Sequence, residues 1–144
     1  MQEPAKDIQE KFVLYQLLNQ RLEELKQHAM MIQHKMVEFE TSKFALNEMK
    51  GAKPESEMLV PVGSGIYTFG KSSSSQNVLI DLGAGVLAKK TLEDATGFIE
   101  KKKKEVEDAA QLLQAEANAI TAKLQEIIPE LQKAAQEQNS LTGG

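Results

Sequence analysis

The sequence lacks cysteine and tryptophan, and aromatic residues make up only 5% of its 144 positions. Without cysteine the chain can form neither disulfides nor thiolate metal sites, which favours a reducing compartment. A compact globule of this size normally fills its core with more large aromatic side chains. The abundant residue types are Lys, Glu, Gln, Ala and Leu, a mixture typical of long helices and coiled coils.

Long apolar runs and an excess of basic charge are also absent. The longest apolar runs are about four residues, far short of the ~20 that cross a bilayer. Charged and amide residues interrupt the first twenty positions, unlike a signal peptide. The formal charge of −4 offers no basic surface for nucleic acid. We therefore expect a cytoplasmic protein that binds neither membrane nor nucleic acid.

Two long segments carry apolar residues at alternating steps of three and four, the pattern of a left-handed coiled coil. The first segment is predicted to be helical over residues 5–50, with Gly51 at a C-cap position. The residues predicted to form its seam, the stripe that faces a partner helix, are Ile8, Lys11, Tyr15, Leu18, Leu22, Leu25, Ala29, Ile32, Met36, Phe39, Lys43 and Leu46.

The second helix is predicted over residues 91–138, with Thr91 as N-cap and a frayed tail at 139–144. Pro129 should kink this helix or end its regular part. Two successive steps of four, at Ala109, Leu113 and Ala117, predict a stutter in the repeat. The predicted seam is Leu92, Ala95, Ile99, Lys102, Val106, Ala109, Leu113, Ala117, Ile120, Leu124, Ile127, Leu131 and Ala134.

Residues 58–89, between the helices, contain four short runs of strand-forming residues separated by glycine-containing turns. This pattern predicts two β-hairpins. So small a sheet is marginal alone and leaves its edges unpaired, so we interpret it as an assembly module. The residues assigned to assembly are Leu59, Val60, Val62, Ile66, Phe69, Val78, Ile80, Leu82 and Val86.

The two predicted helices are nearly equal in length and their connector is short, which favours antiparallel pairing. Leu46 should then lie near Ala95, and Leu18 near Leu124. The predicted fold is mainly α with a small β segment: one domain over residues 1–144, a long antiparallel two-helix coiled coil with two β-hairpins at one end. Both chain termini should meet at the opposite end, the tip.

Apolar residues outside the seam gather near that tip. Phe12, Val13, Leu14 and Leu17 spread around the first helix, and Ile128 lies off the seam of the second. Exposed apolar clusters mark binding surfaces or contacts between copies, and both interpretations stay open. Nearer the hairpins, a second stripe at seven-residue spacing, assigned to packing against neighbouring subunits, comprises Met30, Val37 and Phe44.

The segment Gly65–Ser72 matches the phosphate-loop pattern G-x-x-x-x-G-K-[ST]. Its four internal residues favour a strand, and the serines after Lys71 do not open a helix, so a hairpin is the better interpretation. A nucleotide-dependent enzyme is the rival, which would require ATP binding. His28 and His34 lie on different faces of a helix and should share no metal. We expect no catalytic residue, metal or cofactor.

The order helix, Leu59–Gly65 strand segment, Val78–Gly85 strand segment and helix resembles the α-class subunit of prefoldin, in which two hairpins distinguish α-class from β-class chains. The resemblance implies a hexamer of two α-class and four β-class subunits, joined through their hairpins. It also implies an ATP-independent holding chaperone that captures unfolded polypeptides at its tips and transfers them to a group II chaperonin. The alternative is a structural coiled-coil spacer or filament former without client binding. The expected client-binding residues are Phe12, Val13, Leu14, Leu17, Ile128 and Leu131.

Overall fold

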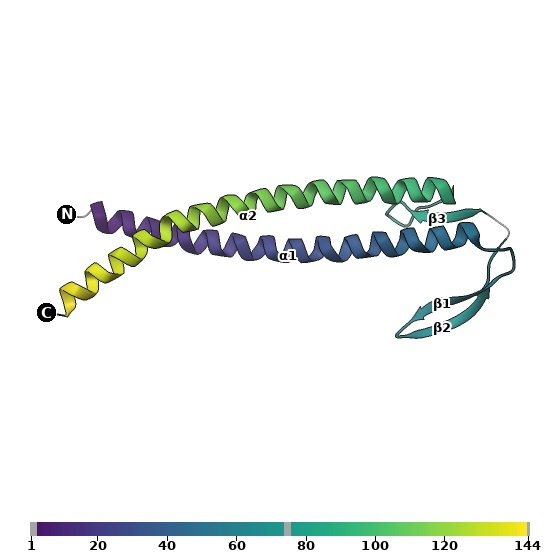
Figure 1. Cartoon of the computed structure of the whole chain (residues 1–144), viewed down its shortest axis with the longest axis horizontal. Coiled ribbons are helices and arrows are strands. Elements are labelled where there is room, and N and C mark those ends of the chain that lie inside the picture. The colour runs from purple at the N-terminus through teal and green to yellow at the C-terminus, as the bar shows by residue number, and fades with distance from the viewer. Residues whose placement is uncertain (1–2, 74–75, 144) are drawn as a thin grey trace. The chain divides into compact units, whose positions relative to one another are not determined.

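The computed structural model describes residues 3–73 and 76–143. Ser74 and Ser75, in the predicted turn between the hairpins, and Gly144, in the predicted tail, lie outside the described residues. Two long helices flank two β-hairpins in the chain (Figure 1), which confirms the predicted fold class. The elements are α1 (Glu3–Gly51), β1 (Glu57–Gly63), β2 (Ile66–Lys71), β3 (Asn77–Asp81), β4 (Leu87–Thr91) and α2 (Leu92–Thr142).

The chain forms two compact units, and each helix contributes to both. The terminal unit comprises Met1–His34 and Glu107–Gly144. Its core is a cluster of Leu25, Ile120 and Leu124, against which Leu18 and Leu113 also pack. The predicted proximity of Leu18 and Leu124 is thereby confirmed.

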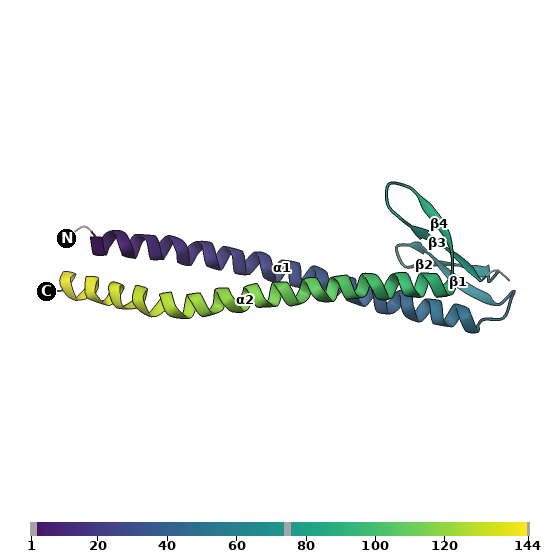
Figure 2. The ribbon, with the colours of Figure 1, turned by 90° about the horizontal axis from the view of Figure 1, so that it is seen from above.

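Ion pairs across the terminal unit give the direction of its helices. Lys11 pairs with Glu130, and Arg21, further along α1, pairs with Glu116, which lies earlier in α2. The two helices are therefore antiparallel in this unit. The ends of α1 and α2 that carry the chain termini point the same way (Figure 2) and diverge beyond the place where the helices cross in Figure 1.

The hairpin unit comprises Lys35–Val106. Leu46, Leu92 and Ala95 form its buried cluster, which confirms the predicted proximity of Leu46 and Ala95. Lys43 pairs with Glu100, and Glu40 pairs with Lys103, so the helices are antiparallel here too.

Each hairpin is a separate two-stranded antiparallel sheet, β1 with β2 and β3 with β4. Both turns hold three successive residues at positive φ: Gly63-Ser64-Gly65 and Gly83-Ala84-Gly85. Glycine adopts this backbone region without the steric cost of a Cβ, which explains the repeated Gly-x-Gly. The middle residues Ser64 and Ala84 lie at φ 53° and 52°.

The start of α2 agrees with the boundary predicted from the sequence, but its end does not. The Thr91 hydroxyl accepts a hydrogen bond from the Asp94 backbone N–H at 3.1 Å, as expected of an N-cap. However, α2 continues through Pro129 to Thr142, so Pro129 does not end the helix and residues 139–142 are helical rather than frayed. Ile127, with 3% of its surface exposed, anchors the turn before the proline.

The seam of α2 differs from the predicted one at two positions. Lys102 and Ala109 are exposed, whereas Lys103 and Ala110 are partly buried. The stutter therefore falls at Lys103, four residues after Ile99, and not at Ala117. A run of four lysines and a pair of alanines offer no hydropathy difference between neighbours, so only packing decides which residue faces the partner helix. On α1, the predicted seam residues Ile8 and Ala29 are exposed.

Candidate functional site

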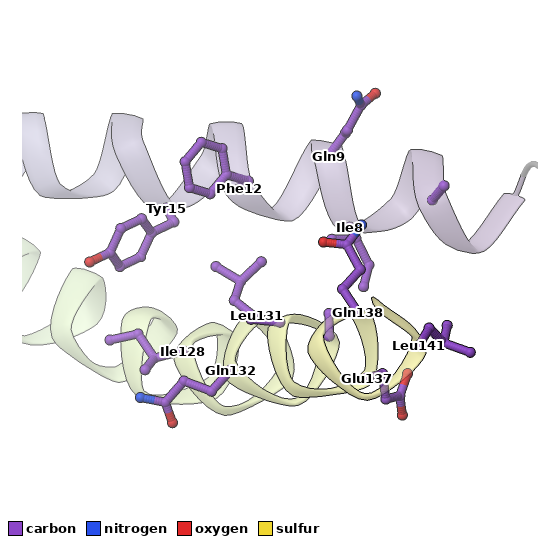
Figure 3. Close-up of a pocket in the computed structure, with 13 residues that line it drawn as sticks. Ile8, Gln9, Phe12, Tyr15, Ile128, Leu131, Gln132, Glu137, Gln138 and Leu141 are labelled. Carbon is purple, nitrogen blue, oxygen red and sulfur yellow. The ribbon is translucent and has the colours of Figure 1, made fainter. Parts of the chain in front are cut away.

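A groove of about 900 Å³ lies in the terminal unit, between residues 5–15 of α1 and residues 128–141 of α2. We call it the terminal groove. Figure 3 shows its lining, in which Tyr15 projects from α1 toward α2 and Leu131 projects back. The lining residues are Ala5, Ile8, Gln9, Phe12, Tyr15, Ile128, Leu131, Gln132, Ala134, Ala135, Glu137, Gln138 and Leu141.

The terminal groove is an open apolar surface. Phe12 and Leu141 keep 50% and 84% of their surface exposed, and the Phe12 and Tyr15 rings stack with centroids 6.4 Å apart. The polar side chains of the lining are mostly glutamines. Such a surface can bury apolar groups of a ligand, at roughly 25 cal/mol for each Å² removed from water.

Of the six residues predicted to bind clients, Phe12, Ile128 and Leu131 line the terminal groove. Val13, Leu14 and Leu17 do not line it, although they are exposed. These three lie on other faces of α1 because successive residues rotate by about 100° around a helix. They form a separate exposed patch on the same helix.

Three groove residues with large apolar or aromatic side chains were not predicted to bind clients. Ile8 and Tyr15 were assigned to the seam, and Leu141 to the frayed tail, yet all three line the groove. The signal for Leu141 is present in the sequence, because it continues the three-four repeat beyond Leu131 through Ala134 and Gln138.

Charged pairs join the helices beside the groove. Lys11 Nζ lies 2.5 Å from Glu130 Oε2 and 3.0 Å from Asp7 Oδ2, and these hydrogen bonds, the one with Glu130 foremost, raise the pKa of Lys11.

Further from the chain ends, Arg21 contacts both carboxylate oxygens of Glu116, at 2.7 and 3.1 Å. These hydrogen bonds raise the pKa of Arg21 and lower that of Glu116.

In the hairpin unit, the β1–β2 hairpin carries a second exposed apolar surface. Leu59 is paired with Phe69, and Pro61 with Tyr67, so these four side chains share one face of the hairpin. Phe69 keeps 73% of its surface exposed and Leu59 keeps 59%.

Of the nine residues assigned to assembly, seven are exposed on the two hairpins and their turns: Leu59, Val60, Val62, Ile66, Phe69, Leu82 and Val86. Val78 and Ile80 differ, because they are partly buried against the cluster of Leu46, Leu92 and Ala95. The β3–β4 hairpin thus packs one face on the helices of its own chain. Exposed apolar hairpin residues that were not predicted are Met58, Tyr67, Leu79 and Leu87.

The remaining sequence motifs lie in a strand and on a helix surface. Most of Gly65–Ser72 is strand β2, with Gly70 opposite Met58 on β1, so the hairpin interpretation is confirmed. A phosphate loop would instead lead from a strand into a helix. His28 and His34 are exposed, and over residues 3–73 and 76–143 no three His, Asp or Glu side chains are placed to hold a metal.

The stripe residues Met30, Val37 and Phe44 are each exposed by more than half of their surface. In the described part of the chain, neither helix has an apolar stretch long enough to span a bilayer.

A family model for prefoldin subunits matches residues 18–137. Prefoldin subunit alpha 1 of Thermococcus kodakarensis is 33% identical over 105 residues, which are 73% of this chain and 72% of the relative. Prefoldin subunit alpha of Pyrococcus horikoshii is 24% identical over 140 residues, 96% of this chain and 95% of the relative.

Two solved structures share the fold. A chain from the cryo-EM structure of filamentous PFD from Methanocaldococcus jannaschii has a TM-score of 0.70 and 22% identity, covering 85% of this chain and 98% of its own. The prefoldin beta subunit from Thermococcus strain KS-1 has a TM-score of 0.56 and 17% identity, covering 89% and 91%. With two hairpins between long antiparallel helices, and with relatives named as alpha subunits, the chain belongs to the prefoldin family as an α-class subunit.

Proposed function

We propose that the chain captures unfolded polypeptides in its terminal groove and transfers them to a group II chaperonin. Prefoldin subunits are chaperones and not enzymes, and in this proposal client capture takes place in the cytoplasm without ATP. The observation that carries the proposal is the apolar terminal groove, open to solvent between Phe12 of α1 and Leu131 of α2.

An open apolar groove suits a holding chaperone. It can bury apolar side chains of many sequences, because the hydrophobic effect is not directional. Binding at one groove is weak, since only part of a client segment is enclosed. Several grooves in one assembly would raise the overall affinity through effective concentration, which fits a complex of two α-class and four β-class subunits.

The β1–β2 hairpin supports the assembly part of the proposal. Its face of Leu59, Pro61, Tyr67 and Phe69 is exposed in this chain, and its strand edges can accept further strands. We expect β-class subunits to cover this face in the complex.

Suppression of aggregation tests client capture. The assembled complex is mixed with a chemically unfolded protein, and light scattering follows aggregation on dilution. Changing Phe12 and Leu141 together to Ser should weaken protection strongly, because each change removes about 1–2 kcal/mol of apolar burial from each bound segment. Both side chains are largely exposed, so the fold should tolerate the changes.

Two control pairs make the result specific. Met31 and Leu112, exposed by 68% and 74% in the same unit, are changed together to Ser and should leave protection intact. Val13 and Leu17 changed to Ser test the patch outside the groove. Loss of protection in that pair alone would move the site to the outer face of α1, and equal protection by all variants would refute client capture by this chain.

The second candidate is a structural role as a filament former. It is favoured by the likeness to a chain from filamentous PFD of Methanocaldococcus jannaschii. Electron microscopy of the purified protein, with and without a β-class partner, separates the two roles. Filaments that give no protection against aggregation would support the structural role.

A further inference from the structure

The lining of the terminal groove carries a negative charge and no positive charge. Among the thirteen lining residues, Glu137 is charged and none is Lys or Arg. Figure 3 shows Glu137 on the same end of α2 as Leu141, with its carboxylate on the side of α2 away from α1. These two residues are four apart, and such residues are neighbours on a helix surface.

The surroundings of the groove are acidic as well. The terminal unit contains six Lys and Arg against eleven Asp and Glu, a formal charge of −5, while the hairpin unit contains eleven against ten, a charge of +1. The acidity of the chain is therefore concentrated in the unit that holds the groove.

Two lysines lie near the groove. Lys11 is already engaged by Asp7 and Glu130, and Lys133, one helical turn before Glu137 on α2, is exposed. Within residues 3–73 and 76–143, no ion pair involves the Glu137 carboxylate. A cation that arrives with a ligand would therefore find a carboxylate beside the apolar surface.

From this charge complementarity we propose that the terminal groove prefers client segments in which apolar residues are flanked by Lys or Arg, with Glu137 receiving the flanking cation. The inference rests on the proposed function and adds its client class. Apolar side chains would contact Phe12, Leu131 and Leu141, and the adjacent cation would lie one helical turn away at Glu137.

The expected preference is modest. An exposed ion pair is worth a factor of about two to five in affinity, and neighbouring carboxylates of the acidic unit add to it at low ionic strength. Salt should reduce the preference, because the Debye length falls from about 30 Å at 0.01 M to about 10 Å at 0.1 M ionic strength.

Two synthetic peptides test the inference. They share one unstructured core of Leu and Phe, flanked by Lys in one peptide and by Glu in the other. Fluorescence anisotropy measures the affinity of both for the complete complex, assembled with wild-type chain, Glu137→Gln, Glu137→Lys or Glu107→Gln. Glu107 is exposed, belongs to the same unit and lies about 45 Å along α2 from Glu137, so its variant changes net charge equally but far from the groove.

We expect the Lys peptide to bind more tightly, the preference to shrink in Glu137→Gln and reverse in Glu137→Lys, and Glu107→Gln to resemble wild type. Equal reduction by Glu107→Gln and Glu137→Gln would overturn the assignment to Glu137. Equal binding of both peptides to wild type would overturn the inference and leave client capture standing. If neither peptide binds and Phe12→Ser abolishes self-association of the complex, the groove is a contact between copies, and the proposed function fails too.

Discussion

Lys11 and Glu130 form an ion pair across the helices at the terminal groove, with Lys11 Nζ 2.5 Å from Glu130 Oε2. Lys11 occupies a seam position, where most other residues of α1 are apolar, and its neighbours along the helix, Ile8 and Phe12, line the groove. An exposed ion pair therefore bridges the two helices there, whereas Leu25, further along α1, packs in a buried apolar cluster.

Changing Lys11 to Leu should stabilise the terminal unit and weaken client binding. The exposed ion pair contributes little to stability, whereas a leucine at a seam position would bury apolar surface and draw the helices together. Thermal unfolding followed by circular dichroism should show a rise of a few degrees in Tm. A lower Tm would mean that the ion pair, and not apolar burial, sets the pairing here.

Truncation of Leu25 should lower the free energy of unfolding more than truncation of any other residue of the terminal unit. Only 2% of its surface is exposed, so Leu25→Ala leaves a cavity against Ile120 and Leu124 and should cost about 2–4 kcal/mol of unfolding free energy. Urea unfolding measures this value. Leu112→Ala, at a position exposed by 74%, is the control and should stay within about 0.5 kcal/mol of wild type.

Acid should weaken the helix pairing in both units. Hydrogen bonds from basic partners lower the pKa of Glu40, Glu100 and Glu116. A lowered folded-state pKa means that each pair stabilises the fold above the ordinary glutamate pKa and that this stabilisation is lost as pH falls through the folded value.

Unfolding curves recorded from about pH 7 down to about pH 2 measure this loss. A variant with Gln at Glu40, Glu100 and Glu116 should be less stable at neutral pH and should lose less stability in acid. A pH profile parallel to that of wild type would contradict the assignment to these pairs.

Phe69→Ser should impair assembly with a β-class subunit. The ring is 73% exposed, opposite Leu59 in the β1–β2 hairpin, and buried aromatic residues at interfaces commonly contribute about 2 kcal/mol or more. Size-exclusion chromatography with light scattering should show a smaller complex at micromolar concentration. Thr68→Ser, on the opposite face of the hairpin, should assemble normally, and an equal defect in both variants would indicate a general weakening of the hairpin.

The helices, their antiparallel pairing and the two hairpins could be predicted from the sequence because each depends on local signals. The repeat of three and four residues specifies a seam wherever apolar and polar residues differ, as at Leu18, Leu22 and Leu25. The Gly-x-Gly turns specify tight reversals because L-residues rarely adopt positive φ. Because the two helices have similar lengths and a short connector, they can pair only in the antiparallel direction.

Where local sequence signals do not distinguish two residues, tertiary packing decides which of them is buried. Ala109 and Ala110 have the same hydropathy, so only contact with the other helix placed Ala110 in the seam. Val78 and Phe69 are both apolar strand residues, yet Val78 packs on the buried cluster of the hairpin unit and Phe69 remains exposed.

The terminal groove likewise joins Phe12 to Leu141, residues far apart in the chain. The sequence alone thus determined the helical segments, their direction and the hairpins. The tertiary structure decided which apolar residues remain exposed for other molecules, because exposure depends on neighbours that are distant in sequence.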